Sequence, residues 1–235
     1  MARKPKRERK APAPPPPPRG TSDRDKAVDA LMALLAEHGF EDIGLAEVAG
    51  RAGLKLSQLR AEFGSTLAIY AAHVKDIDSA VLAGGEDMTD ESPRERLFDV
   101  EMRRLEAMAP YKEAVRSMLR SARRDPPLAL ALNALAVRSQ RWMLEAAGIS
   151  AAGPRGALRA QGAALLFARV LGVWLHDDDP AMDRTMAALD RGLASAERWD
   201  GFIGDLCCIP AAICRGPGRL RRRRMRYEDE EPEAA

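Results

Sequence analysis

The stretch that decides the fold is residues 44–70, GLAEVAGRAGLKLSQLRAEFGSTLAIY. Two short runs with helical spacing, 45–51 and 56–62, are separated by Ala52-Gly53-Leu54, where the glycine favours a tight turn. Ser65 can cap the helix that follows. Two short helices joined by a turn that contains glycine can place the second helix in the major groove of DNA. The stretch therefore predicts a helix-turn-helix.

The composition of the whole chain favours helices. Its 235 residues include 42 alanines and 26 leucines against 9 valines and 7 isoleucines. Further helix-start signals stand at Ser92-Pro93, Pro110, Asp125-Pro126, Gly153-Pro154 and Asp179-Pro180, each before an apolar stretch with helical spacing. We expect an all-α chain of about nine helices, four short ones followed by five longer ones.

The sequence divides into four segments of different character. We expect a basic, proline-rich tail over 1–22, a helix-turn-helix domain over 23–72 and a larger helical bundle over 73–200. An apolar segment and then an Arg-rich and acidic tail follow over 201–235.

The formal net charge of +2 averages over regions of opposite sign. Residues 1–20 carry seven Lys or Arg and one Glu, and residues 215–227 carry seven Arg. Five acids follow in 228–235, so residues 21–214 hold 23 bases against 29 acids, a net charge of −6. We expect affinity for a polyanion to come largely from the basic tails.

Residues 23 to about 70 resemble the DNA-binding domain of TetR-family transcriptional regulators. The resemblance is carried by Val48-Ala49, by Ala52-Gly53-Leu54 at the turn, by Leu59, by Phe63 and by Ser65. It implies a cytoplasmic homodimer that binds double-stranded DNA. It also implies that the long helices bind a ligand and that the last two of them form the dimer contact, for which Gly156, Gly162, Ala163 and Ala164 would allow close approach.

The sequence departs from the family at three positions that usually hold DNA phosphates, which here are Arg60, Glu62 and Thr66. Arg60 can bind a phosphate or guanine and Thr66 can donate one hydrogen bond, but Glu62 has the wrong charge. Gln58 could pair with adenine, and the tail 3–10 could add phosphate contacts. The alternative is a retained scaffold that no longer touches DNA. The candidate DNA-binding residues are Lys55, Ser57, Gln58, Arg60 and Thr66.

Large apolar side chains recur on the predicted inward faces of the long helices. Such positions are either plain core or the lining of a cavity for a small apolar ligand, which the resemblance implies. The candidate pocket residues are Phe98, Met102, Tyr111, Met118, Trp142, Phe167 and Trp174.

A second resemblance involves residues 174–180, Trp-Leu-His-Asp-Asp-Asp-Pro, followed by 185–190. It is similar to a stretch shared by some TetR-like regulators and by ubiquinone-biosynthesis lipid-binding proteins of TetR-like fold. His176 and the three aspartates 177–179 are possible metal ligands by type, but Asp before Pro is also an ordinary helix cap. We expect no metal and no cofactor.

The apolar residues 199–214 precede an arginine run at 221–224. This combination can hold a protein to an anionic membrane surface, or it can be a tail that packs on the body. The first reading supports an alternative function, a lipid- or quinone-binding accessory protein with a membrane-contacting C-terminal segment. Cys207, Cys208 and Cys214 are odd in number and have no disulfide spacing.

The sequence gives little reason to expect an enzyme. His38, His73 and His176 are far apart along the chain, and neither a nucleophile motif nor a glycine-rich phosphate loop accompanies them. The basic start runs into prolines rather than into the apolar stretch of a signal peptide. We therefore expect a cytoplasmic protein that is not an enzyme.

Overall fold

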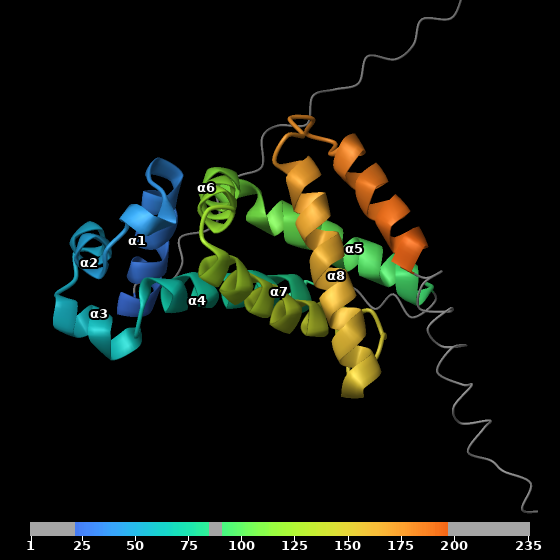
Figure 1. Cartoon of the computed structure of the whole chain (residues 1–235), viewed down its shortest axis with the longest axis horizontal. Coiled ribbons are helices and arrows are strands. Elements are labelled where there is room, and N and C mark those ends of the chain that lie inside the picture. Colours follow the sequence, from blue (N-terminus) through green and yellow to red (C-terminus); the bar gives the residue numbers. More distant parts are fainter. Residues whose placement is uncertain (1–21, 85–90, 197–235) are drawn as a thin grey trace, which may run out of the picture. The chain divides into compact units, whose positions relative to one another are not determined.

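The computed structural model of the protein describes residues 22–84 and 91–196 (Figure 1). These two ranges contain helices and no strand, which confirms the all-α prediction. A further helix covers 183–196, so the number of α-helices in the described ranges is close to the predicted nine, although the fourth helix, with 18 residues, is not one of the short ones. The preceding elements are α1 (Asp23–Glu37), η1 (Phe40–Asp42), α2 (Leu45–Ala52), α3 (Leu56–Glu62), α4 (Thr66–Ala83), α5 (Pro93–Met108), η2 (Ala109–Tyr111), α6 (Lys112–Ala122), α7 (Pro126–Ala146) and α8 (Gly153–Trp174).

Four of these helices begin at side chains that act as caps. The hydroxyl of Ser22 accepts from the backbone N–H of Asp25, and that of Ser65 accepts from Ala68, both at 3.1 Å. Ser92 forms a reciprocal capping box with Glu95 at the start of α5, and Asp125 accepts from Leu128 at 3.1 Å at the start of α7. These bonds satisfy backbone donors that the first turn of a helix leaves free.

Two hydrophobic cores organise the described helices, and α4 belongs to both. The first core joins α1, α2 and α3 to α6 and to the start of α7, and α4 contributes Ile69 and Tyr70 to it. The second core joins α5, α7, α8 and the helix over 183–196, and α4 contributes Ile77 and Val81. Figure 1 shows α4 leading from the first group of helices toward the second. The division at residue 72 stays a prediction, because one helix runs through both cores.

The last helix begins later than predicted. It starts at residue 183 rather than at Asp179-Pro180, because Asp177 supplies its cap. The Asp177 carboxylate accepts from the backbone N–H of Thr185 at 2.9 Å and from its hydroxyl at 2.7 Å, and both side chains are buried. Pro110 likewise lies in the short turn η2, and α6 itself begins at Lys112.

The prediction that Trp142 faces inward is wrong, because 60% of this residue is exposed. The buried face of α7 instead includes two polar residues, Ser139 and Gln140, next to Met143. These polar residues shift the centre of the buried face around the helix and leave Trp142 outside it.

Among the described helices, α8 alone is long and apolar enough to cross a bilayer by length and composition. Core helices of globular proteins also have such composition. Phe167, Val170 and Trp174 of α8 are buried in the second core.

Gly53 provides a test of the turn between α2 and α3. It has φ of +66°, a left-handed conformation that closes α2 with backbone bonds to Ala49 and Gly50. We expect Gly53→Ala to lower the free energy of unfolding by about 1–2 kcal/mol, since a Cβ disfavours this conformation. Gly50→Ala is the matched control, because Gly50 lies inside α2 with open space around it. That control should raise stability by about 0.5–1 kcal/mol in urea unfolding, and equal effects of both variants would contradict the turn geometry.

Asp177 provides a test of the loop before the last helix. Burial opposes its ionisation, but the hydrogen bonds from Thr185 and from the backbone of Asp179, with the charge of Arg184, together hold the pKa of the carboxyl below its usual value. We expect Asp177→Ala to cost about 1–3 kcal/mol at pH 7, because it leaves the buried hydroxyl of Thr185 without this partner. A lowered pKa in the folded state stabilises the protein above the usual carboxyl pKa, and this stabilisation is lost as the pH falls through the folded value. The difference between wild type and variant should therefore shrink in urea unfolding below about pH 4.

The neighbouring Asp178 is the control for that measurement. It is exposed, so Asp178→Ala should leave the free energy of unfolding nearly unchanged at every pH. A difference between wild type and Asp177→Ala that stays constant down to pH 2 would contradict the capping role.

Candidate nucleic-acid interface

The helix pair α2 and α3 packs on α1 through one buried side and presents the other side to solvent. Val48 and Ala49 of α2 and Leu59 of α3 are buried in the first core. Gly53 and Lys55 lie between the helices, and the backbone N–H of Leu54 donates to Ala49 at 2.9 Å. The remaining residues of α3 are all exposed, as a helix that enters a DNA groove requires.

Gln58 is engaged within the protein. Its amide oxygen accepts from the backbone N–H of Lys55 at 2.9 Å, which caps α3. Its amide nitrogen donates to Asp23 at 2.8 Å, at the first residue of α1. Each end of the amide therefore has one internal contact and keeps one further hydrogen or lone pair, so pairing with adenine would compete with the contacts that fix the start of α3.

Arg60, unlike Gln58, makes no contact of this kind. It is exposed, and within the described ranges of the chain it forms no hydrogen bond or ion pair. Its guanidinium is therefore available for a phosphate or for guanine. Glu62 is also exposed, two residues further along α3, so the same helix presents one base and one acid.

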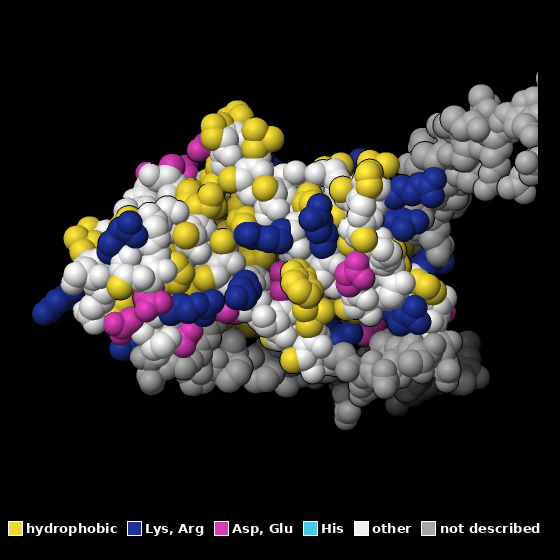
Figure 2. Space-filling view, turned by 90° about the horizontal axis from the view of Figure 1, so that it is seen from below, with side chains coloured by type: hydrophobic (Ala, Val, Ile, Leu, Met, Phe, Trp, Pro, Cys, Tyr) yellow, Lys and Arg dark blue, Asp and Glu magenta, His cyan; other side chains and the backbone are white. Residues whose placement is uncertain are grey.

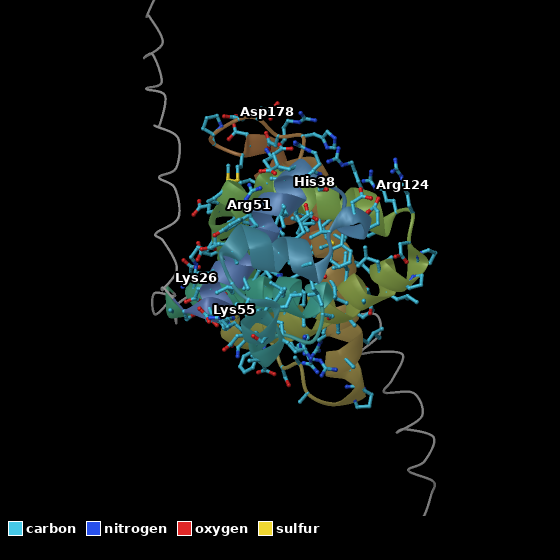
Figure 3. All side chains as sticks on the ribbon, turned by 90° about the vertical axis from the view of Figure 1, so that its left-hand side faces the viewer. Lys26, His38, Arg51, Lys55, Arg124 and Asp178 are labelled. Carbon is cyan, nitrogen blue, oxygen red and sulfur yellow. The ribbon has the colours of Figure 1, made fainter. Side chains whose placement is uncertain are left out.

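Several other cations of this region are paired with acids. Arg51 donates to both oxygens of Glu37, at 2.5 and 3.1 Å, and this contact holds the pKa of the Glu37 carboxyl below its usual value. Lys26 lies 3.5 Å from Asp23. Figure 3 shows Lys26 and Lys55 on the left of the molecule and Arg124 on its right. In Figure 2, acidic and basic side chains alternate over the end that carries α2 and α3.

The remaining predicted DNA contacts lie at the starts of α3 and α4. Lys55 and Ser57 are exposed at the start of α3, and Thr66 is half-buried as the first residue of α4. The structure thus places Ser57 and Arg60 on α3 and Lys55 at its N-cap. The tail 3–10 and the membrane-contact segment 199–224, including all three cysteines, lie outside the described residues.

The seven candidate pocket residues do not form one group. Met102, Phe167 and Trp174 are buried in the second core, and Phe98 packs against it. Met118 is instead fully buried in the first core, while Tyr111 packs against both cores. Trp142 is on the surface, so at most part of this set could line one pocket.

The possible metal ligands at 176–179 have structural contacts. The ring nitrogen Nδ1 of His176 lies 2.9 Å from the carbonyl oxygen of Gly172, and Asp177 caps the last helix. In the described part of the chain, no group of three or more His, Cys, Asp or Glu residues is arranged to hold a metal ion.

Sequence analysis missed a buried polar cluster in the second core. It lies among residues of α4, α5 and α7, and its members are Asp78, Glu101, Arg104, Ser139 and Gln140. A signal for it exists in α5, where Glu101 and Arg104 fall in the same helical phase as the buried Leu97 and Met108. Charged residues usually lie on the surface, so Glu101 and Arg104 were not expected on the buried side of α5 in spite of their phase.

Comparison with known proteins relates the chain to others through its structure. No family model matches the sequence, and no curated protein matches it. A TetR transcriptional regulator from Nitrosomonas europaea superimposes with a TM-score of 0.58 at 22% identity, over 74% of this chain and 97% of that one. A TetR transcriptional regulator from Rhodococcus sp. RHA1 gives a TM-score of 0.53 at 20% identity, over 74% and 95% of the two chains. The chain therefore has the fold of TetR transcriptional regulators.

Proposed function

We propose that the protein is a cytoplasmic, homodimeric transcriptional regulator that binds double-stranded DNA and responds to a small ligand. The observation that carries this proposal is the exposed outer side of α3, where Arg60 forms no hydrogen bond or ion pair with any other residue that the structure describes. The TetR-like fold supports the same reading, because it presents α3 as the second helix of a helix-turn-helix. We expect no catalytic activity.

Lys55, Ser57, Arg60 and Thr66 are the proposed DNA contacts. Arg60 would bind guanine or a phosphate, while the other three would hold the backbone. Gln58 is assigned a positioning role, since it joins the start of α3 to Asp23 of α1. The basic tail 3–10 would add sequence-independent phosphate contacts to a domain that is itself slightly acidic, with six bases and eight acids over 23–75.

The DNA proposal is tested with the full chain and a labelled duplex that covers the DNA flanking its own gene, with a scrambled duplex at the same salt concentration. We expect saturable, sequence-selective binding in a gel shift or in fluorescence anisotropy. Arg60→Ala should weaken selective binding about 10–100-fold, since a bidentate contact to guanine contributes about 1–3 kcal/mol.

Glu62→Gln is the matched control on the same helix. It removes a negative charge that faces the DNA, so binding should become tighter. Equal binding of both duplexes by the wild type, with no effect of Arg60→Ala, would contradict the regulator and leave the lipid-binding accessory protein as the better reading.

The proposed dimer contact uses α8 and the helix over 183–196. These two helices lie close together, because a Cβ on Gly192 would come within 2.1 Å of a side-chain atom of Leu166. On its outer side, α8 exposes Leu158 and Leu165, with 53% and 52% of their surface accessible, and Gly162 lies between them. Leucines around a small residue fit a twofold contact in which each helix meets its own copy.

We expect the double variant Leu158→Glu/Leu165→Glu to be monomeric at micromolar concentration in light scattering, while the wild type is dimeric. Each lost leucine removes about 1.5–3 kcal/mol of apolar burial, and a twofold contact counts each loss twice. Trp142→Ser removes an exposed apolar side chain from α7 and should leave the dimer intact. A dimeric double variant would place the contact elsewhere.

A further inference from the structure

The outer side of α3 has a centre and two flanks. Successive residues of an α-helix lie about 100° apart, so the direction opposite the buried Leu59 falls between Ser57 and Ala61. Two pairs of residues, each pair four positions apart, form the flanks: Leu56 with Arg60, and Gln58 with Glu62. All of these outer residues are exposed, so each can meet a partner that covers this side of the helix.

The two flanks differ in their contacts within the protein. Gln58 ties its flank to α1, because its amide nitrogen donates to Asp23 at 2.8 Å. On the other flank, Arg60 forms no hydrogen bond or ion pair within the described ranges. Leu56 is neither buried in the first core nor among the partly buried residues that pack against it. The flank of Leu56 and Arg60 is therefore available to a ligand.

Leu56 is a large apolar side chain that the fold leaves in water. Its exposed fraction is 55%, whereas that of Leu59 on the same helix is 2%. Covering this surface on binding would be favourable, because apolar area would leave water. Leu56 also stands between Lys55 and Ser57, at the end of α3 whose residues reach base edges when such a helix enters the major groove. Leu56 is thus placed to touch a base with an alkyl group.

The chemistry of the major groove decides which base fits an alkyl group. Thymine presents its C5-methyl group there, while adenine, guanine and cytosine present hydrogen-bond donors and acceptors. A leucine that covered those polar atoms would remove their water without replacing its hydrogen bonds, which is costly. The small side chains of Ser57 and Ala61 at the centre of the outer side let α3 approach the bases closely. Thymine is therefore the base that Leu56 matches.

We propose that Leu56 selects thymine through contact with its C5-methyl group. This inference rests on the proposed DNA binding and names part of the sequence that the regulator recognises. Leu56 and Arg60 are about 6 Å apart along the helix axis, and base pairs follow one another at about 3.4 Å. The selected thymine therefore lies within about two base pairs of the position that Arg60 contacts.

Deoxyuridine tests the contact, because it differs from thymidine in its base only by lacking the methyl group. The full chain is titrated by fluorescence anisotropy with the duplex from the DNA flanking its own gene, and the thymines of the protected region are replaced one at a time. At one position at least, the replacement should weaken wild-type binding about fourfold, which corresponds to one methyl group left unburied. Leu56→Ala should bind the thymine and deoxyuridine duplexes equally at that position.

Two further variants separate the methyl contact from a general effect of the substitution. Leu56→Met keeps an apolar side chain of similar volume, so it should still prefer thymine. Leu130→Ala is the matched control, because Leu130 is 72% exposed on α7, outside the helix-turn-helix. This control should bind both duplexes as the wild type does. Thermal unfolding shows that each variant is folded, and substitutions at such exposed positions should change stability little.

Three outcomes would overturn the proposal. Selective binding that depends on Arg60 but is unaffected by deoxyuridine at every position would show that no methyl group is read, and it would leave the proposed function standing. A folded Leu56→Ala that still prefers thymine over deoxyuridine would assign the methyl contact to another residue. Wild-type binding without any sequence selectivity would contradict the proposed function and this inference together.

Discussion

The fixed position of α4 is the constraint on which the rest of the structure depends. Arg24 of α1 holds Asp76 with two hydrogen bonds, of 2.7 and 3.1 Å, while Asp78 is held by Ser139 of α7 and Arg104 of α5. Two residues correspond to about 200° around a helix, so these carboxylates leave α4 on nearly opposite sides. A movement of α4 must therefore break polar contacts with the first core, with the second core, or with both.

Contacts of the same kind pair half of the bases in the slightly acidic helix-turn-helix domain. Arg24 and Arg51 each hold a carboxylate with two hydrogen bonds, and Lys26 lies near Asp23. These contacts connect the helices of the first core, and Gln58 adds α3 to the set through Asp23. Three of the six bases over 23–75 are thus paired within the domain. Arg60 of α3 is exposed and is not among the paired ones in the described residues.

Local chemistry made the fold largely predictable. Caps at Ser22, Ser65, Ser92 and Asp125 act within one turn, so the sequence reveals where those helices begin. The start of the last helix was mispredicted because its cap comes from Asp177, eight residues before the backbone N–H that it binds. Such contacts depend on how the loop folds back, which no short-range pattern encodes. The same limit applies to the internal contacts of Gln58, whose partner Asp23 lies 35 residues away.

The polar cluster marks a deeper limit of sequence-based prediction. An apolar residue at each of its buried positions would satisfy the helical pattern of α5, and replacing a buried ion pair with apolar groups is often neutral or stabilising. Hydrophobic periodicity predicts which side of a helix is buried, but it cannot predict which buried positions carry polar groups. Where such groups occur they are paired across helices, as Asp78 of α4 is with Ser139 of α7 and Arg104 of α5, so contacts between distant segments rather than a local pattern explain them.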